Sequence, residues 1–110
     1  MRHQVGLLNE LEPGCVRQAG LPDGRPICLA RTVDGQVFAV DDTCSHEDGA
    51  LSDGELIGNE IQCPMHYSRF DVRTGEPRSL PAFDPVQTFQ VILGENDELF
   101  VELPEQAPTS

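Results

Sequence analysis

The stretch ICLARTVDGQVFAV, residues 27–40, decides the fold class of this 110-residue chain. Two runs of mostly apolar residues flank Asp34-Gly35, and an Asp-Gly pair adopts the positive backbone angles of a tight hairpin turn at little cost. Apolar runs of this length bounded by turn residues are typical of strands. The stretch therefore predicts two antiparallel strands, at residues 27–32 and 36–40.

The same pattern of short strands around a turn recurs further along the chain. It is found at residues 56–62, 68–75 and 88–102. Gly and Pro make up 19 of the 110 residues, which favours many turns. No stretch of about ten or more residues shows helical periodicity free of Gly and Pro. We therefore expect one all-β domain built from antiparallel sheets.

Charge excludes several classes of partner. Seven Arg and no Lys oppose 19 Asp and Glu, which gives a net charge of −12. A protein that binds nucleic acid or an anionic membrane would carry the opposite sign. The acidic surface is either a solvated face or a docking face for basic partners. No apolar run is long enough to span a membrane, and the N-terminus lacks a secretory leader, so we expect a cytoplasmic protein.

Two short clusters carry the chemistry of the chain. Cys44 and His46 form a C-x-H pair, and Cys63 and His66 form a C-x-x-H pair sixteen residues later. Each cluster lies in a turn-rich segment directly after a predicted strand. Loops at strand ends can bring four ligands around one centre, so we expect these four residues to bind one metal centre.

The ligand types favour iron and sulfur over zinc. Structural zinc sites prefer closely spaced cysteine pairs, whereas each loop here offers one thiolate and one imidazole. That division suits a [2Fe–2S] cluster in which two Cys hold one iron and two His hold the other. A zinc site stays open as an alternative. A nucleophilic Cys–His pair is also conceivable, but two matched pairs would make it redundant.

The clusters, together with Phe70-Asp71 and Thr74-Gly75, resemble the Rieske [2Fe–2S] family. The resemblance is to the small ferredoxins of bacterial multicomponent aromatic-ring dioxygenases. Further matching segments are residues 11–14, 39–42, 51–54 and 80–82. The resemblance implies a base of antiparallel sheets at about residues 1–42 and 82–103, with a cluster-binding subdomain at about 43–81. Residues 104–110 lack apolar anchors, and we expect a mobile tail there.

The function follows from the centre and the resemblance together. The chain has no G-x-G-x-x-G fingerprint for a nucleotide or flavin and no three-ligand catalytic metal site, so we expect no enzyme activity of its own. The resemblance implies a monomeric one-electron carrier between a flavin-containing NAD(P)H-dependent ferredoxin reductase and a terminal ring-hydroxylating oxygenase. Two alternatives stay open: the Rieske-like small subunit of an assimilatory nitrite reductase, and a zinc-stabilised structural module. The substrate of the oxygenase cannot be read from this chain.

The sequence departs from the pattern of respiratory Rieske proteins at residues that affect the reduction potential of the cluster. Respiratory Rieske proteins carry an extra Cys in each ligand loop, where this chain has Gly49 and Met65, so the loop disulfide of those proteins cannot form. Ser68 keeps a hydroxyl near the cluster, whereas Phe70 replaces a tyrosine. Fewer hydrogen bonds to cluster sulfur lower the potential. We expect a value in the lower part of the Rieske range of roughly −150 to +300 mV.

The remaining polar and sulfur-containing residues receive structural interpretations. Cys15 and Cys28 are expected to be buried or half-buried with reduced thiols. Asp41 and Asp42 are expected to shape the turn into the first ligand loop. Three arginines are expected either to balance nearby acids or to orient a docking surface: Arg69, Arg73 and Arg78.

Overall fold

The computed structural model describes every residue except 1, 23, 43–49, 64–68, 79–85 and 103–110. Across those residues the chain is all-β, with helical residues only in three short 3-10 helices, which confirms the predicted fold class. The strands are β1 (Arg2–Leu7), β2 (Cys15–Gly20), β3 (Pro26–Arg31), β4 (Val37–Asp41), β5 (Glu55–Ile57), β6 (Glu60–Gln62), β7 (Arg69–Asp71), β8 (Thr88–Leu93) and β9 (Glu98–Glu102). The 3-10 helices are η1 (Leu8–Glu10), η2 (Leu51–Asp53) and η3 (Glu95–Asp97).

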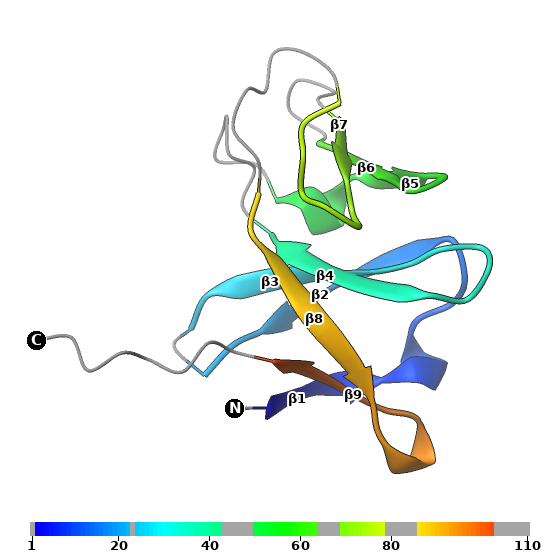
Figure 1. Ribbon diagram of the computed structural model, residues 1–110, viewed down its shortest axis with the longest axis vertical. Helices are drawn as coiled ribbons and strands as arrows, with labels where there is room; N and C mark the ends of the chain where they lie inside the picture. Colours follow the sequence, from blue (N-terminus) through cyan, green and yellow to red (C-terminus); the bar gives the residue numbers. More distant parts are fainter. Residues whose placement is uncertain (1, 23, 43–49, 64–68, 79–85, 103–110) are drawn as a thin grey trace, which may run out of the picture.

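Six strands form the larger sheet, in the order β1-β9-β8-β4-β3-β2, with every neighbour antiparallel (Figure 1). The β3–β4 hairpin is the one predicted around Asp34-Gly35, and Gly35 has the positive φ of 93° that this turn requires. The β8–β9 hairpin confirms the strand pair predicted at residues 88–102. The base of the molecule is therefore built mainly from hairpins whose turns are visible in the sequence.

The larger sheet divides between β4 and β8. These two strands share only two residue pairs, Ala39 with Phe89 and Val40 with Thr88. Beyond Phe89, strand β8 continues as a partner of β9 from Gln90 onward, while β4 continues as a partner of β3. The two halves of the sheet consequently diverge, and a gap opens between β4 and the far end of β8 (Figure 1).

The smaller sheet contains β5, β6 and β7 and lies beside one face of the larger sheet (Figure 1). Its β5–β6 hairpin confirms the strands predicted around Gly58-Asn59. After β7 the chain turns back, and Phe70 bridges to Pro77. Gly75 in this turn has a φ of +81°, and a Cβ there would lie 2.1 Å from the carbonyl oxygen of Val86. Only glycine fits this close approach, which holds the smaller sheet against the chain that leads into β8.

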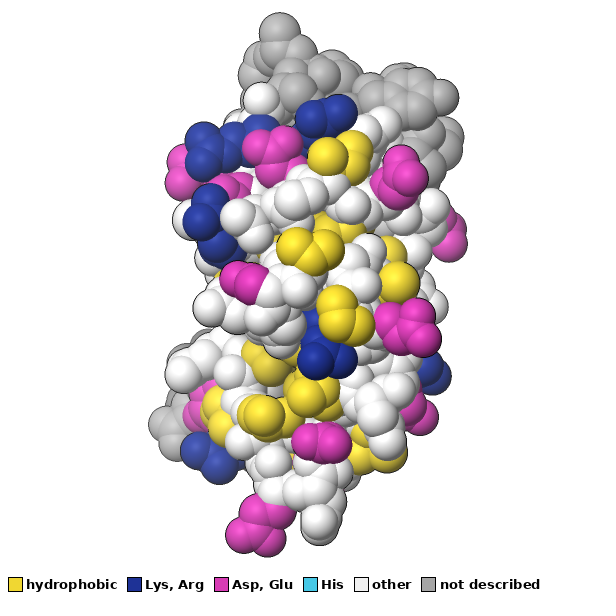
Figure 2. Space-filling model, turned by 90° about the vertical axis from the view of Figure 1, so that its right-hand side faces the viewer, with side chains coloured by type: hydrophobic (Ala, Val, Ile, Leu, Met, Phe, Trp, Pro, Cys, Tyr) yellow, Lys and Arg dark blue, Asp and Glu magenta, His cyan; other side chains and the backbone are white. Residues whose placement is uncertain are grey.

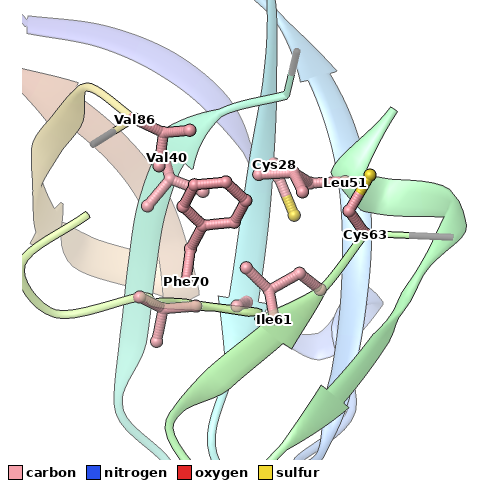
Figure 3. Close-up of a cluster of buried hydrophobic side chains, with 9 residues drawn as sticks. Cys28, Val40, Leu51, Ile61, Cys63, Phe70 and Val86 are labelled. Atoms are coloured by element: carbon pink, nitrogen blue, oxygen red, sulfur yellow. The ribbon is translucent and has the colours of Figure 1, made fainter. Parts of the chain in front are cut away.

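Two apolar cores stabilise this arrangement. The first lies within the larger sheet and consists of Leu11, Leu21, Ile27, Leu29, Ala39, Phe89, Leu99 and Val101. The second joins the two sheets and consists of Cys28, Ala30, Val40, Leu51, Ile61, Cys63, Phe70, Val72 and Val86 (Figure 3). Phe70 is fully buried there, pointing from β7 toward Val40 and Val86 (Figure 3). The second core fixes the smaller sheet on β3 and β4.

Two strands and one cysteine differ from the sequence-based expectations. Strands β1 and β2 were not predicted, because both lie at edges of the larger sheet and bury none of their residues fully. Cys28 is buried as expected, whereas the expectation for Cys15 is wrong, because it lies exposed on β2. The predicted tail at residues 104–110 lies outside the described residues. Within the described ranges, no helix is long and apolar enough to cross a membrane.

Candidate metal centre

Of the four predicted ligands, the structure describes Cys63. This residue directly follows β6, is 0% exposed and belongs to the core between the sheets (Figure 3). Cys44, His46 and His66 lie outside the described residues. Among the residues that are described, no group of three or more His, Cys, Asp or Glu side chains is placed to hold a metal ion. The ligand set is therefore argued from the segments that flank the two loops.

The base of the first loop is held by Asp42, which follows β4 and is 1% exposed. Its carboxylate accepts hydrogen bonds from Gln18 Nε2 at 2.7 Å, from the Ser52 backbone N–H at 2.7 Å and from Ser52 Oγ at 3.0 Å. The Leu51 N–H also donates to the Asp42 carbonyl at 2.7 Å. The two ends of the loop are thus joined, which confirms a turn-forming role for Asp42.

The base of the second loop is a strand pair. Gln62 at the end of β6 pairs with Arg69 at the start of β7, on either side of residues 63–68. The Arg78 N–H donates to the Arg69 carbonyl at 2.6 Å, so the chain beyond β7 returns to the same place. The smaller sheet therefore closes this loop at its base.

The two loop bases meet. A Cβ at Gly54, just after η2, would lie 1.8 Å from the carbonyl oxygen of Gln62, so the chain after the first loop presses on the chain before Cys63. Leu51 and Cys63 also share the second core and lie side by side in Figure 3. Two thiols and two imidazoles on loops that start from one place fit the ligand set of a Rieske-type cluster.

Cys28 shares the second core with Cys63 but lies on β3, outside the two Cys–His clusters. Burial raises the pKa of the Cys28 thiol strongly, and the negative charge of Asp42 raises it further. Cys28 therefore packs as a neutral thiol on β3, in the core that joins the two sheets. The remaining described cysteine, Cys15, lies on the exposed edge strand β2.

A buried carboxylate, Asp71, holds the turn after β7. Arg73 donates to Asp71 Oδ1 from its backbone N–H at 2.8 Å and from Nε at 3.1 Å, and to Oδ2 from Nη2 at 3.0 Å. Arg78 Nη2 donates to Oδ2 at 3.2 Å. The Arg73 side-chain hydrogen bond is the main cause that lowers the Asp71 pKa from 3.8 to about 2, with smaller contributions from the Arg73 N–H and from Arg78, while burial acts in the opposite direction.

The three arginines of this region therefore balance acids, as the first of the two interpretations expected. Arg69 lies 3.8 Å from Glu60 across the β6–β7 pair. The Asp71 cluster itself was not predicted, although the short spacing from Asp71 to Arg73 is a signal that could have indicated it. This cluster orients the segment that leads away from the smaller sheet at Arg78.

Comparison with known families now gives the class of protein. The family model of the Rieske [2Fe-2S] domain matches residues 2–90. The chain belongs to this family, which confirms the resemblance seen in the two Cys–His clusters. A Rieske domain implies a [2Fe–2S] cluster, so the expected cofactor is confirmed at that level.

Similar proteins indicate which kind of Rieske protein this chain resembles. The chain is 42% identical over 94 residues to the ferredoxin component of biphenyl 2,3-dioxygenase from Rhodococcus jostii, covering 86% of this chain and 85% of that relative. It is 36% identical over 102 residues to the ferredoxin component of the p-cumate 2,3-dioxygenase system of Pseudomonas putida, covering 90% and 85%. These relatives are ferredoxin components and not catalysts, which confirms the expectation of an electron-transfer component.

Solved structures agree on the fold. A chain in the complex of reduced oxygenase and oxidized ferredoxin of carbazole 1,9a-dioxygenase is 35% identical, covers 91% of both chains and has a TM-score of 0.84. A protein described as a nitrite reductase small subunit from Mycobacterium tuberculosis has a TM-score of 0.81 and covers 92% of this chain and 93% of its own. At 20% identity, that second likeness shows the fold alone.

Proposed function

We propose that this chain is the one-electron carrier of a multicomponent aromatic-ring dioxygenase system. In this proposal Cys44 and Cys63 bind one iron of the [2Fe–2S] cluster, and His46 and His66 bind the other. The observation that carries it is the meeting of the two loop bases at Leu51, Gly54 and Cys63. When bound, the cluster supplies reversible uptake and release of one electron.

The residues around the loops serve that task by position. Burial of Cys63 in an apolar core keeps water away from the thiolate and limits its exchange or oxidation. Asp42 and Asp71 fix the chain on either side of the two loops through the hydrogen bonds described above. Supporting groups of this kind orient metal ligands and tune the centre.

The partners in this proposal are a flavin-containing NAD(P)H-dependent ferredoxin reductase as donor and a terminal ring-hydroxylating oxygenase as acceptor. The oxygenase is supported by the neighbouring structure of an oxygenase–ferredoxin complex. The reductase is carried over from the family resemblance of the sequence. A monomer suits a carrier that meets two partners in turn through small interfaces. The proposal keeps the expected division into a base (1–42 and 82–103) and a cluster-binding subdomain (43–81).

The nitrite reductase alternative has weaker support. The likeness to that small subunit concerns the fold alone, whereas the ferredoxin relatives match at 36–42% identity. A zinc-stabilised module is likewise disfavoured, because the chain belongs to a [2Fe–2S] family. Neither alternative is carried forward.

Metal analysis and cysteine variants test the proposal. We expect two iron and two sulfide per chain, and a reduced-state paramagnetic resonance signal of low average g value. The variant Cys63→Ser should lose most of the iron, whereas Cys15→Ser should retain it, because Cys15 lies exposed on β2. Zinc in place of iron, or equal iron loss in both variants, would contradict the ligand assignment. Reduction of oxygenase by the purified chain then tests the acceptor.

A further inference from the structure

The gap between β4 and β8 carries an apolar hollow of about 370 Å³. Figure 2 shows the face of the molecule that carries the β3–β4 and β8–β9 turns, where hydrophobic side chains gather with a basic side chain among them. Its lining comes from η1, the β3–β4 turn, β4, β8 and β9: Leu8, Gly35, Gln36, Val37, Phe38, Val91, Leu93 and Leu99. None of these residues belongs to the two ligand loops, so the hollow is separate from the metal centre.

The hollow continues along the divergence of the two strands. A second hollow of about 370 Å³ shares Val37, Phe38 and Val91 with the first and reaches Val72 and Arg73. The β4–β8 ladder ends at Ala39 and Phe89, so beyond that pair the two strands no longer pair with each other. Strand edges that face each other across an apolar groove suit an extended peptide, which binds by adding backbone hydrogen bonds to alternating side-chain contacts.

An exposed leucine marks the groove. Leu93 lines the hollow and is 58% exposed, so its side chain is accessible to a ligand there. Val33, on the β3–β4 turn, is 82% exposed but does not line the hollow. These two side chains therefore form a matched pair for testing: similar in chemistry, both exposed, one inside the groove and one outside it.

The rim of the groove is negative. Five acidic residues stand within two chain positions of a residue that lines the first hollow: Glu10, Asp34, Glu95, Asp97 and Glu98. No arginine stands that close along the chain. The Arg31 guanidinium reaches the Gly35 turn and donates from Nη1 to the Leu11 carbonyl at 2.9 Å, and Arg17 Nη1 donates to the Glu10 carbonyl at 3.4 Å, so these two arginines offset two of the five charges. Arg73, which lines the second hollow, is paired with Asp71. An apolar floor with an acidic rim is complementary to a ligand that is both apolar and basic.

We propose that this groove binds an extended segment of a partner protein, in which apolar side chains alternate with Lys or Arg. The apolar side chains fill the hollow between β4 and β8, and the basic ones meet the acidic rim. The inference goes beyond electron transfer and does not rest on it.

A labelled eight-residue peptide of alternating Ile and Lys tests this inference on the cluster-loaded protein by fluorescence anisotropy. We expect a dissociation constant below about 1 mM that weakens with salt. The variant Leu93→Glu should weaken binding at least about tenfold, whereas Val33→Glu should change it less than about twofold. Unchanged cluster absorbance and circular dichroism confirm that both variants are folded. Amide shifts should be confined to β4, β8 and the adjoining turns.

Control peptides separate the two parts of the recognition. Replacing Lys by Glu in the peptide, or Ile by Ala, should abolish binding. The double variant Glu95→Gln/Asp97→Asn should weaken binding and reduce its salt dependence, and asparagine tolerates the positive φ of 62° at position 97. No binding at about 1 mM, equal loss in Val33→Glu, or equal binding of the Glu peptide would overturn the proposal. A dimer in sedimentation that Leu93→Glu dissociates would overturn it too, because a second copy would then occupy the groove.

Discussion

Replacing Asp71 with asparagine removes the buried negative charge that Arg73 and Arg78 hold, while keeping the shape of the side chain. A pKa lowered from 3.8 to about 2 corresponds to about 2.5 kcal/mol of stabilisation if it is taken at face value. The two arginine side chains are 51% and 48% exposed, so water and salt screen much of this. We therefore expect the free energy of unfolding to fall by about 1–1.5 kcal/mol in Asp71→Asn.

The same geometry ranks three arginine variants. Arg73 makes three hydrogen bonds to Asp71, two of them from its side chain, whereas Arg78 makes one at 3.2 Å. Arg69 lies 3.8 Å from Glu60, with both side chains partly exposed, where an ion pair contributes about 0–1 kcal/mol. Substitution by glutamine should destabilise the protein most at Arg73, less at Arg78 and least at Arg69.

The assay is urea unfolding of the cluster-loaded protein, followed by circular dichroism at pH 7. The pH dependence supplies a second test. Because the folded-state pKa of Asp71 lies below its usual value, the stabilisation is complete above about pH 4 and is lost as the pH falls toward 2. The difference between wild type and Asp71→Asn should therefore stay constant from pH 7 to 5. A difference that declines over that interval, or an Arg69→Gln loss equal to that of Arg73→Gln, would refute the reasoning.

Substitutions at Gly75, Asp42 and Phe70 probe the junctions that support the loops. Gly75→Ala should destabilise the protein by at least about 2 kcal/mol more than Gly58→Ala, because both have a positive φ but only Gly75 faces a carbonyl oxygen, at 2.1 Å from a Cβ; equal urea midpoints would contradict this. Asp42→Ala should cost about 1–3 kcal/mol and speed iron loss to a chelator, since the half-buried Ser52 N–H loses its acceptor; unchanged iron release would count against a loop-closing role. Phe70→Ala should cost about 3–5 kcal/mol in thermal or urea unfolding, and Phe70→Leu much less, because the ring is fully buried between the sheets; similar losses for both would show that the core there is adaptable.

Much of the fold could be predicted, because several of its strands are joined by turns that are recognisable in the sequence. The hairpins around Asp34-Gly35 and Gly58-Asn59 carry their own turn chemistry, and both occur where they were expected. Strand β1 has no such turn pair, whereas Asp23-Gly24 does stand between β2 and β3. Both strands were missed because neither edge strand buries a residue fully, so neither shows a run of apolar residues. Strand β1 pairs with β9, from the other end of the chain, and strand β2 pairs with β3 across a turn. The position of each edge strand therefore depends on its partner strand.

The candidate site likewise combines residues that a short stretch of sequence identifies with residues whose roles depend on contacts between distant parts of the chain. The Cys–His spacing identified the ligand candidates, because metal ligands cluster along the chain and the residue types are rare. The residues that support the loops were less visible. Asp42 meets Gln18 from a strand 24 residues earlier, and nothing local to either residue indicates the other. The turning role of Asp42 could be predicted, but its burial and its partners depend on how the sheets pack.

The closure of both loops at their bases has a consequence for assembly of the protein with its cofactor. Bringing together the ends of a loop of roughly ten residues costs about 2 kcal/mol of chain entropy. Here the Leu51–Asp42 hydrogen bond and the Gln62–Arg69 strand pair form as the sheets fold, so folding itself supplies the free energy that closes both loops. On the proposed ligand assignment, binding of the cluster then needs to supply little free energy for bringing the loop ends together. We therefore expect that loops of equal length from related ferredoxins can be exchanged into this chain while its two sheets stay folded.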